Sequence, residues 1–233
     1  MNGCRLSFLH NMKTIAHIAL WMTCLCAVAE DMPATPVLTP KQEQALQKDV
    51  EAIKKQALLI CTIRDAASAE AAFDELCRLR SLQMMQKRHL QSIRFESRAQ
   101  FRAVQARYGW SEQDSMENKY QSERLGSQQF YGIAKLARLF GLSAQYAQPI
   151  TPTPPADDRE ALCQLLRTIN SQATADAAAP RVAELLQKSG IAPALIMGYH
   201  PEADYEIRML HAEYVSLHAV GFYGSAPLRA LWQ

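Results

Sequence analysis

Apolar residues recur at steps of three and four along most of the chain beyond residue 40, which is the spacing of one helix face. The pattern predicts a first helix over residues 40–64, with Thr39 as its N-cap and Gln42 completing a capping box. A second helix is predicted from Ser68 to Tyr108, because no Pro or Gly interrupts that stretch.

The remaining elements follow from their start and stop residues. Prolines at positions 149, 152, 154 and 155 indicate an extended linker over residues 147–157. On either side of the linker the sequence predicts a helix restarted at Ser111–Asp114 and extending toward Gly141, a helix from Asp157 to about Ile169, a helix from Thr174 to about Lys188 that Gly190 ends, an amphipathic helix over 201–218, and a short helix carrying Leu228, Leu231 and Trp232.

One stretch of the sequence occurs twice. Thr62–Ala72 (TIRDAASAEAA) returns 106 residues later as Thr168–Ala178 (TINSQATADAA), without a gap. A second pair of segments, FYGIAKL from Phe130 and FYGSAPL from Phe222, is separated by 92 residues. Two landmarks in the same order indicate one helical unit used twice. Because 106 exceeds 92 by 14, the second copy is 14 residues shorter between the landmarks.

The repeated motif predicts a corner between two helices. Ser68 and Thr174 are helix N-cap residue types, and Glu70 and Asp176 would then place a carboxylate near the positive end of the helix dipole. The alanines that follow favour helix and allow close packing. We expect a structural corner rather than a ligand-binding turn. Each Phe-Tyr-Gly segment is expected to end a helix where Gly permits a positive φ.

Composition agrees with an all-α fold, since the 233 residues are 48% hydrophobic and include only 9 Gly. A formal net charge of +2 and the lack of a dense basic block argue against specific nucleic-acid binding. The predicted organisation is a signal peptide over 1–29, a Pro-containing tether over 30–40, a first unit over 41–146, the linker over 147–157 and a second unit over 158–233.

The N-terminus has the features of a secretory signal peptide. Arg5 and Lys13 precede an apolar run over residues 15–28, and Ala27-Val28-Ala29 matches an A-x-A cleavage site. The run is shorter than the ~20 residues of a membrane-spanning helix. The first residue and Met12 are both possible starts. We expect export to the periplasm or beyond the cell, with no membrane-spanning segment in the mature chain.

The cysteines leave two questions open. Cys24 and Cys26 do not follow the usual Leu-x-small pattern of a lipoprotein, so lipid anchoring is the less favoured alternative. After cleavage, Cys61, Cys77 and Cys163 would remain. The first two could pair across the corner in an exported protein, and buried free thiols are at least as well supported.

The second predicted helix is rich in cations on the face opposite its apolar stripe. We expect a solvated face, because Glu and Gln lie among these residues. The alternative is a surface for an anionic polymer or lipid head groups. The cationic residues are Arg80, Lys87, Arg88, Arg94, Arg98, Arg102 and Arg107.

The sequence contains no catalytic motif, such as a Gly-rich phosphate loop, G-x-S-x-G or H-E-x-x-H. Asp204, His211 and His218 share a helix face, but seven-residue steps place side chains about 10 Å apart, too far for one metal ion. Asp157-Asp158 is expected to cap a helix, and His89 to lie on the surface. We therefore assign no catalytic, cofactor-binding or metal-ligating residue.

The pairing of T-I-x3-A-[ST]-A-[ED]-A-A with a later F-Y-G motif resembles a group of exported bacterial all-helical proteins of uncharacterised function. The likeness covers Leu58–Leu76, Leu165–Leu185 and the two Phe-Tyr-Gly segments, and Ile133 stands where the second copy has Ser225. The resemblance implies an exported helical protein and brings no functional residue with it.

These observations favour a non-enzymatic interaction or structural module of the bacterial cell envelope. Its partner would be another envelope protein or an anionic polymer. One alternative is an enzyme whose site lies between the two units. Another is a polyanion-binding protein that uses the Arg-rich face.

Overall fold

The computed structural model describes residues 36–91, 93–147 and 153–233. Within these ranges the chain forms helices and no strand, so the predicted all-α class is confirmed. None of the helices described there has the length and hydrophobicity needed to span a bilayer. The predicted signal peptide, most of the tether and part of the linker lie outside the described residues.

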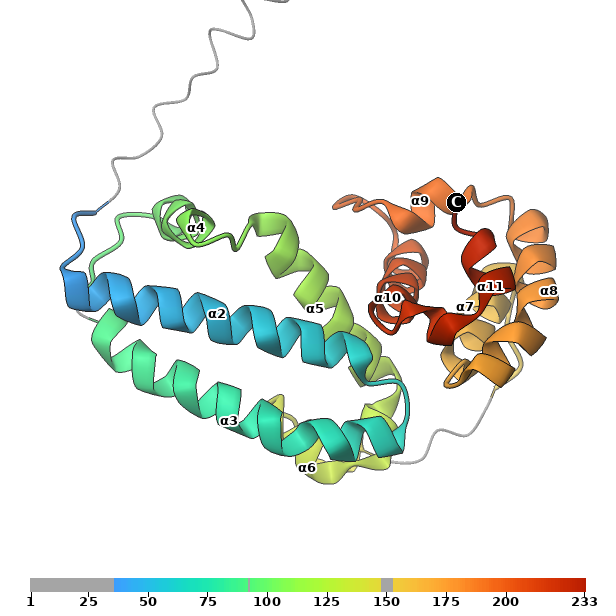
Figure 1. The fold of residues 1–233 in the computed structure, drawn as a ribbon, viewed down its shortest axis with the longest axis horizontal. Coiled ribbons are helices and arrows are strands. Elements are labelled where there is room, and N and C mark those ends of the chain that lie inside the picture. Colours follow the sequence, from blue (N-terminus) through green and yellow to red (C-terminus); the bar gives the residue numbers. More distant parts are fainter. Residues whose placement is uncertain (1–35, 92, 148–152) are drawn as a thin grey trace, which may run out of the picture.

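The first unit is built on a hairpin of two long helices, α2 (Pro40–Thr62) and α3 (Ala66–Leu90) (Figure 1). The shorter helices α4 (Arg98–Arg107) and α5 (Glu112–Ser127) lie across α2 from α3 in Figure 1. The unit ends in turn η1 (Gln129–Gly132), helix α6 (Ala134–Leu139) and turn η2 (Ala144–Tyr146), with η1 and α6 packed against α3.

The second unit has elements in a similar order, and each of its helices is shorter than the helix at the same place in the first unit. Helix α10 packs against α7 in its own unit and against α5 and α2 of the first unit, so it joins the two units. The elements are α7 (Asp158–Thr168), α8 (Gln172–Ser189), α9 (Pro193–Met197), α10 (Tyr205–Ala219), η3 (Gly221–Gly224) and α11 (Ala226–Ala230).

Each unit has an apolar core of its own. One cluster of buried residues, which includes Leu166 and Leu210, lies wholly in the second unit. Two clusters lie in the first unit, one around Leu76 and Leu136 and the other around Trp110. Fully burying a leucine contributes roughly 1.5–3 kcal/mol, so these clusters supply the main driving force for folding each unit.

The two corners are built alike, but their N-caps lie three residues earlier than predicted. Asp65 and Ser171 accept hydrogen bonds from the backbone N–H groups of Ser68 and Thr174, whose side chains accept from the cap N–H groups in return. Ser68 and Thr174 are therefore the reciprocal partners in a capping box. The prediction was wrong because two good cap types lie close together at each corner. The carboxylates two residues further along consequently lie beyond the first turn.

The single helix predicted after the first corner is in fact two helices, α3 and α4. Helix α3 ends at Leu90, and Ser97 caps α4 by accepting a hydrogen bond of 3.1 Å from the N–H of Gln100. The rings of Phe95 and Phe101 pack edge to face with centroids 5.0 Å apart, which fixes the entry into α4. The Ser-x-x-Gln start signal was hidden because the apolar pattern continues across the break.

Both Phe-Tyr-Gly segments adopt the same left-handed turn. The φ angles are 52° and 53° for Phe130 and Tyr131, and again 52° and 53° for Phe222 and Tyr223. The glycines that follow have positive φ as predicted, but the left-handed backbone begins before them. Such a φ costs roughly 1–2 kcal/mol for a residue with a Cβ atom. Burial of the two phenylalanine rings offsets this cost.

Candidate functional site

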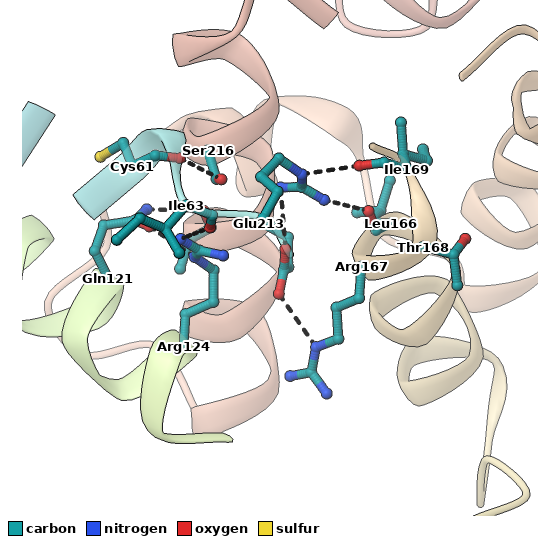
Figure 2. A network of polar contacts seen from close by, with 12 residues as sticks. Cys61, Ile63, Gln121, Arg124, Leu166, Arg167, Thr168, Ile169, Glu213 and Ser216 are labelled. Atoms are coloured by element: carbon teal, nitrogen blue, oxygen red, sulfur yellow. Dashed lines mark hydrogen bonds and ion pairs between the residues drawn. The ribbon is translucent and has the colours of Figure 1, made fainter. Parts of the chain in front are cut away.

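A buried arginine closes the end of α2. Arg124 of α5 is fully buried, and its Nη2 donates to the carbonyls of Ile60 and Ile63 at 3.1 and 2.9 Å (Figure 2). Its Nε donates to Gln121 at 2.8 Å, and Nη1 donates to the hydroxyl of Tyr131 at 3.3 Å. A cation at a helix C-terminus satisfies carbonyls that lack a partner within the helix and complements the helix dipole.

A second buried arginine reaches from the first unit into the second. Arg64, only 2% exposed, donates to the carbonyls of Leu166 and Ile169 at the end of α7, the latter from Nε at 2.9 Å. Its Nη1 lies 3.3 Å from one carboxylate oxygen of Glu213, which is fully buried. The other oxygen accepts from Nε of Arg167 at 3.1 Å. One buried carboxylate therefore serves two guanidinium groups (Figure 2).

The position that corresponds to Arg124 in the second unit, 92 residues later, is Ser216. Its hydroxyl donates to the carbonyl of Cys61 at 2.6 Å, again across the junction. The second unit thus has a small side chain where the first has a capping arginine, and Arg64 supplies the guanidinium instead. At the position corresponding to Gln121, the second unit has Glu213, which balances the incoming charge.

These contacts fill the centre of the junction. Every guanidinium there is engaged by backbone carbonyls, by a carboxylate or by both, so the network acts as a structural lock. Breaking a buried charge pair from one side costs far more than an exposed pair is worth. The arrangement holds the two units together and offers no reactive group.

A polar hollow of about 410 Å³ opens at the edge of the junction, between α7, α10 and the end of α5. Cys163 lines this hollow and carries a side chain that could act as a nucleophile. Burial raises the pKa of its thiol to about 12, so the thiol stays protonated near neutral pH. Asp157 accepts from two backbone N–H groups at the start of α7 and serves as its cap, as predicted. The hollow is lined by Ser127, Ala156, Asp157, Arg159, Glu160, Cys163, Arg167, Tyr205, Glu206 and Met209.

A longer groove of about 480 Å³ lies in the first unit between α2, α3 and the segment that leads into α4; we call it the α3–α4 groove. Exposed Met84 and several half-buried apolar side chains line it, and the cations Arg80 and Lys87 lie among them. Burial raises the pKa of Asp49, which also lines the groove, to about 6. The apolar lining consists of Ile53, Met84, Leu90, Ile93, Phe95 and Phe101.

The predicted cationic face is divided by the break between α3 and α4. Arg102 pairs with Glu112, and Arg107 also has a partner. Among the described residues, the other predicted cations form no ion pair with a carboxylate; these are Arg80, Lys87, Arg88, Arg94 and Arg98.

The three residues considered as metal ligands, Asp204, His211 and His218, each make a different contact. Asp204 caps α10 by accepting from the N–H of Ile207 at 2.9 Å. His211 is buried, with Nδ1 2.8 Å from the carbonyl of Ile196. His218 is exposed and packs beside Tyr214, with ring centroids 5.9 Å apart. In the described part of the chain, no three His, Cys, Asp or Glu side chains come together as a metal site would require.

The three cysteines that remain after the predicted cleavage are free thiols, so the pairing of Cys61 with Cys77 does not occur in the structure. Burial raises the pKa of Cys61 to about 11. Its thiol therefore behaves as a small buried side chain rather than as a nucleophile.

Neither a family model, nor a curated protein, nor a solved structure matches this chain. Function is therefore inferred from the geometry of the chain's own residues.

Proposed function

We propose that this chain is an exported, non-enzymatic interaction module of the cell envelope, built from two copies of one helical unit. Its docking site would be the α3–α4 groove, and the partner an acidic amphipathic helix of another envelope protein. The observation that carries the proposal is the combination, in one groove, of an apolar lining with cations that pair with no carboxylate of the described residues.

The element bounds support the duplication. Helices α2 and α7 end 106 residues apart, as do the starts of α3 and α8. From the end of α5 onward the spacing is 92 residues, for η1 and η3 and for the starts of α6 and α11. Equal spacing of elements, together with equal φ angles in the two Phe-Tyr-Gly turns, favours common descent over coincidence.

The groove has the chemistry of a helix-binding surface. An amphipathic helix buries an apolar stripe, and flexible methionine adapts to different apolar side chains. Met84 is 59% exposed and lies among other apolar side chains of the groove, so its surface is open to a partner. Arg80 and Lys87 would attract acidic residues flanking the stripe and would favour them over basic ones.

Peptide binding to the mature chain tests the proposal. The probe is a fluorescent 18-residue peptide with leucines at helix spacing and glutamates on the opposite face, compared with a scrambled peptide of the same composition. We expect Met84→Asp to weaken binding about tenfold, because it puts a carboxylate into the apolar contact and repels the acidic peptide. Met85→Asp, its exposed neighbour outside the groove lining, is the matched control and should change binding less than about twofold. Equal binding of the scrambled peptide would contradict the proposal.

The unpaired cations also support a second candidate, a polyanion-binding protein. A polyanion needs charge alone, so poly-glutamate without leucines would bind as tightly as the amphipathic peptide, and affinity would fall steeply with added salt. In the docking proposal, poly-glutamate binds much more weakly than the amphipathic peptide. The two candidates therefore give opposite results in the same titration.

A further inference from the structure

A separate hollow of about 430 Å³ lies between α9, α10, η3 and α11; we call it the α10–α11 hollow. Its wall is aromatic. The ring centroid of Tyr214 lies 5.2 Å from that of Trp232, 6.1 Å from that of Phe222 and 5.9 Å from that of His218. The volume is within the range of about 300–1,000 Å³ that is usual for small-molecule sites.

Two polar side chains of this hollow, Arg229 and Trp232, are donors only, whereas Tyr214, His218 and Gln233 can both donate and accept. Trp232 is 4% exposed, and its indole N–H is buried without a hydrogen-bond partner in the described chain. Arg229 donates to the carbonyl of Gly221 at 3.2 Å and forms no ion pair among the described residues. The lining includes no Asp or Glu side chain.

The first unit lacks these groups at the corresponding positions. At a spacing of 92 residues, Tyr214 corresponds to a serine and His218 to a glycine. Arg229 corresponds to an alanine, and Trp232 to a phenylalanine. The element bounds agree at this spacing, so the positions are equivalent in the fold. The aromatic wall, the guanidinium and the indole donor are therefore features of the second unit alone, and core packing common to both units does not require them.

We propose that the α10–α11 hollow binds a small planar aromatic carboxylate. The ligand ring stacks against the Tyr214 side of the wall, where offset or edge-to-face packing is favourable. The carboxylate accepts hydrogen bonds from the fork of Arg229, and Trp232, which lines the hollow, reports on the bound ligand. A cationic ligand would also suit an aromatic wall, but the guanidinium and the lack of an acidic side chain oppose it.

Titration of the full mature chain with phenylacetate, followed by the indole N–H resonance of Trp232, tests this site. Trp232→Phe assigns the resonance by removing it. We expect a saturable shift of this resonance, and Arg229→Gln should weaken binding about tenfold because it removes a charge-assisted pair. Arg138→Gln changes an exposed arginine in the corresponding helix of the first unit and should leave binding unchanged.

Two further probes decide the ligand class. Benzylamine keeps the ring and reverses the charge, whereas cyclohexylacetate keeps the charge and removes the planar ring. Both should bind at least about tenfold more weakly than phenylacetate if ring and carboxylate act together. No shift with millimolar phenylacetate, equal binding of benzylamine, or unchanged binding by Arg229→Gln would each overturn the proposal. The groove in the first unit is not involved, so the peptide experiment and this one fail or succeed separately.

Discussion

The ends of α2 and α7 both have backbone carbonyls without a partner in the helix, and different residues donate to them. Both leave two carbonyls, at equivalent positions, that need donors. In the first unit Arg124 supplies them from the unit's own α5. In the second unit Ser216 stands at that position, and Arg64 supplies them from the other unit. The arginine-to-serine difference, together with Arg64 and Glu213, therefore makes the second unit depend on the first.

This difference indicates which contacts join the two units. Their apolar cores remain separate, so hydrophobic burial alone does not join them. The joining contacts include buried polar bonds, whose partners must be positioned together. They also include ring contacts of Tyr120 in the first unit with Tyr199 and His211 in the second. Arg124 caps the end of α2 from within its own unit, whereas Arg64 caps the end of α7 from across the junction. Ser216 adds a bond from the second unit to the carbonyl of Cys61 in α2.

The largest effect is expected for Glu213→Ala, which removes the carboxylate shared by Arg64 and Arg167. Leaving buried guanidinium groups without it should lower the free energy of unfolding by about 3–5 kcal/mol in urea titrations. Gln121→Ala, at the corresponding position of the first unit, removes a neutral acceptor of Arg124 and a bond to the carbonyl of Ala212 but no charge, and should cost only about 1–3 kcal/mol. If the two variants lose the same stability, charge is not what distinguishes the two units.

Exchanging the capping residues tests whether an arginine in either unit can cap the end of α7. Arg64→Asn should lower the free energy of unfolding by about 1.5–3 kcal/mol and speed hydrogen exchange at the end of α7, because charge-assisted bonds to its carbonyls are lost. Adding Ser216→Arg gives the second unit a cap of its own and should restore about 1 kcal/mol or more. Exchange in the middle of α3, away from both helix ends, is the internal reference. A double variant less stable than Arg64→Asn would show that the two positions are not interchangeable.

A smaller effect concerns pH and only the first unit, because the residue 106 positions after Asp49 is proline rather than an acid. Burial raises the pKa of Asp49 from 3.8 to about 6, so folding favours its protonated form. The associated stability is present below about pH 4 and is lost as the pH rises through about 6.

Asp49→Asn should therefore flatten the dependence of stability on pH between 4 and 7. At pH 7 it should stabilise by about 1 kcal/mol at most, because the partly exposed carboxylate is screened. Urea titrations at several pH values measure the slope, with exposed Asp74→Asn as the control. An unchanged slope in Asp49→Asn would assign the pH dependence to another group.

The all-α class, the two corners and the caps at Thr39, Ser111 and Asp157 could be predicted from the sequence, because periodicity and capping act within a few residues. The caps at Asp65 and Ser171 were misplaced and the start at Ser97 was missed, since several polar residues nearby could serve equally well.

The contacts of the junction follow only from the tertiary structure. The bond from Arg64 to Ile169 spans 105 residues, and no local pattern distinguishes that arginine from the solvated ones of α3. Its role depends on α10 packing between the units, which carries Glu213 and Ser216 to the place where one helix end needs a partner from another part of the chain.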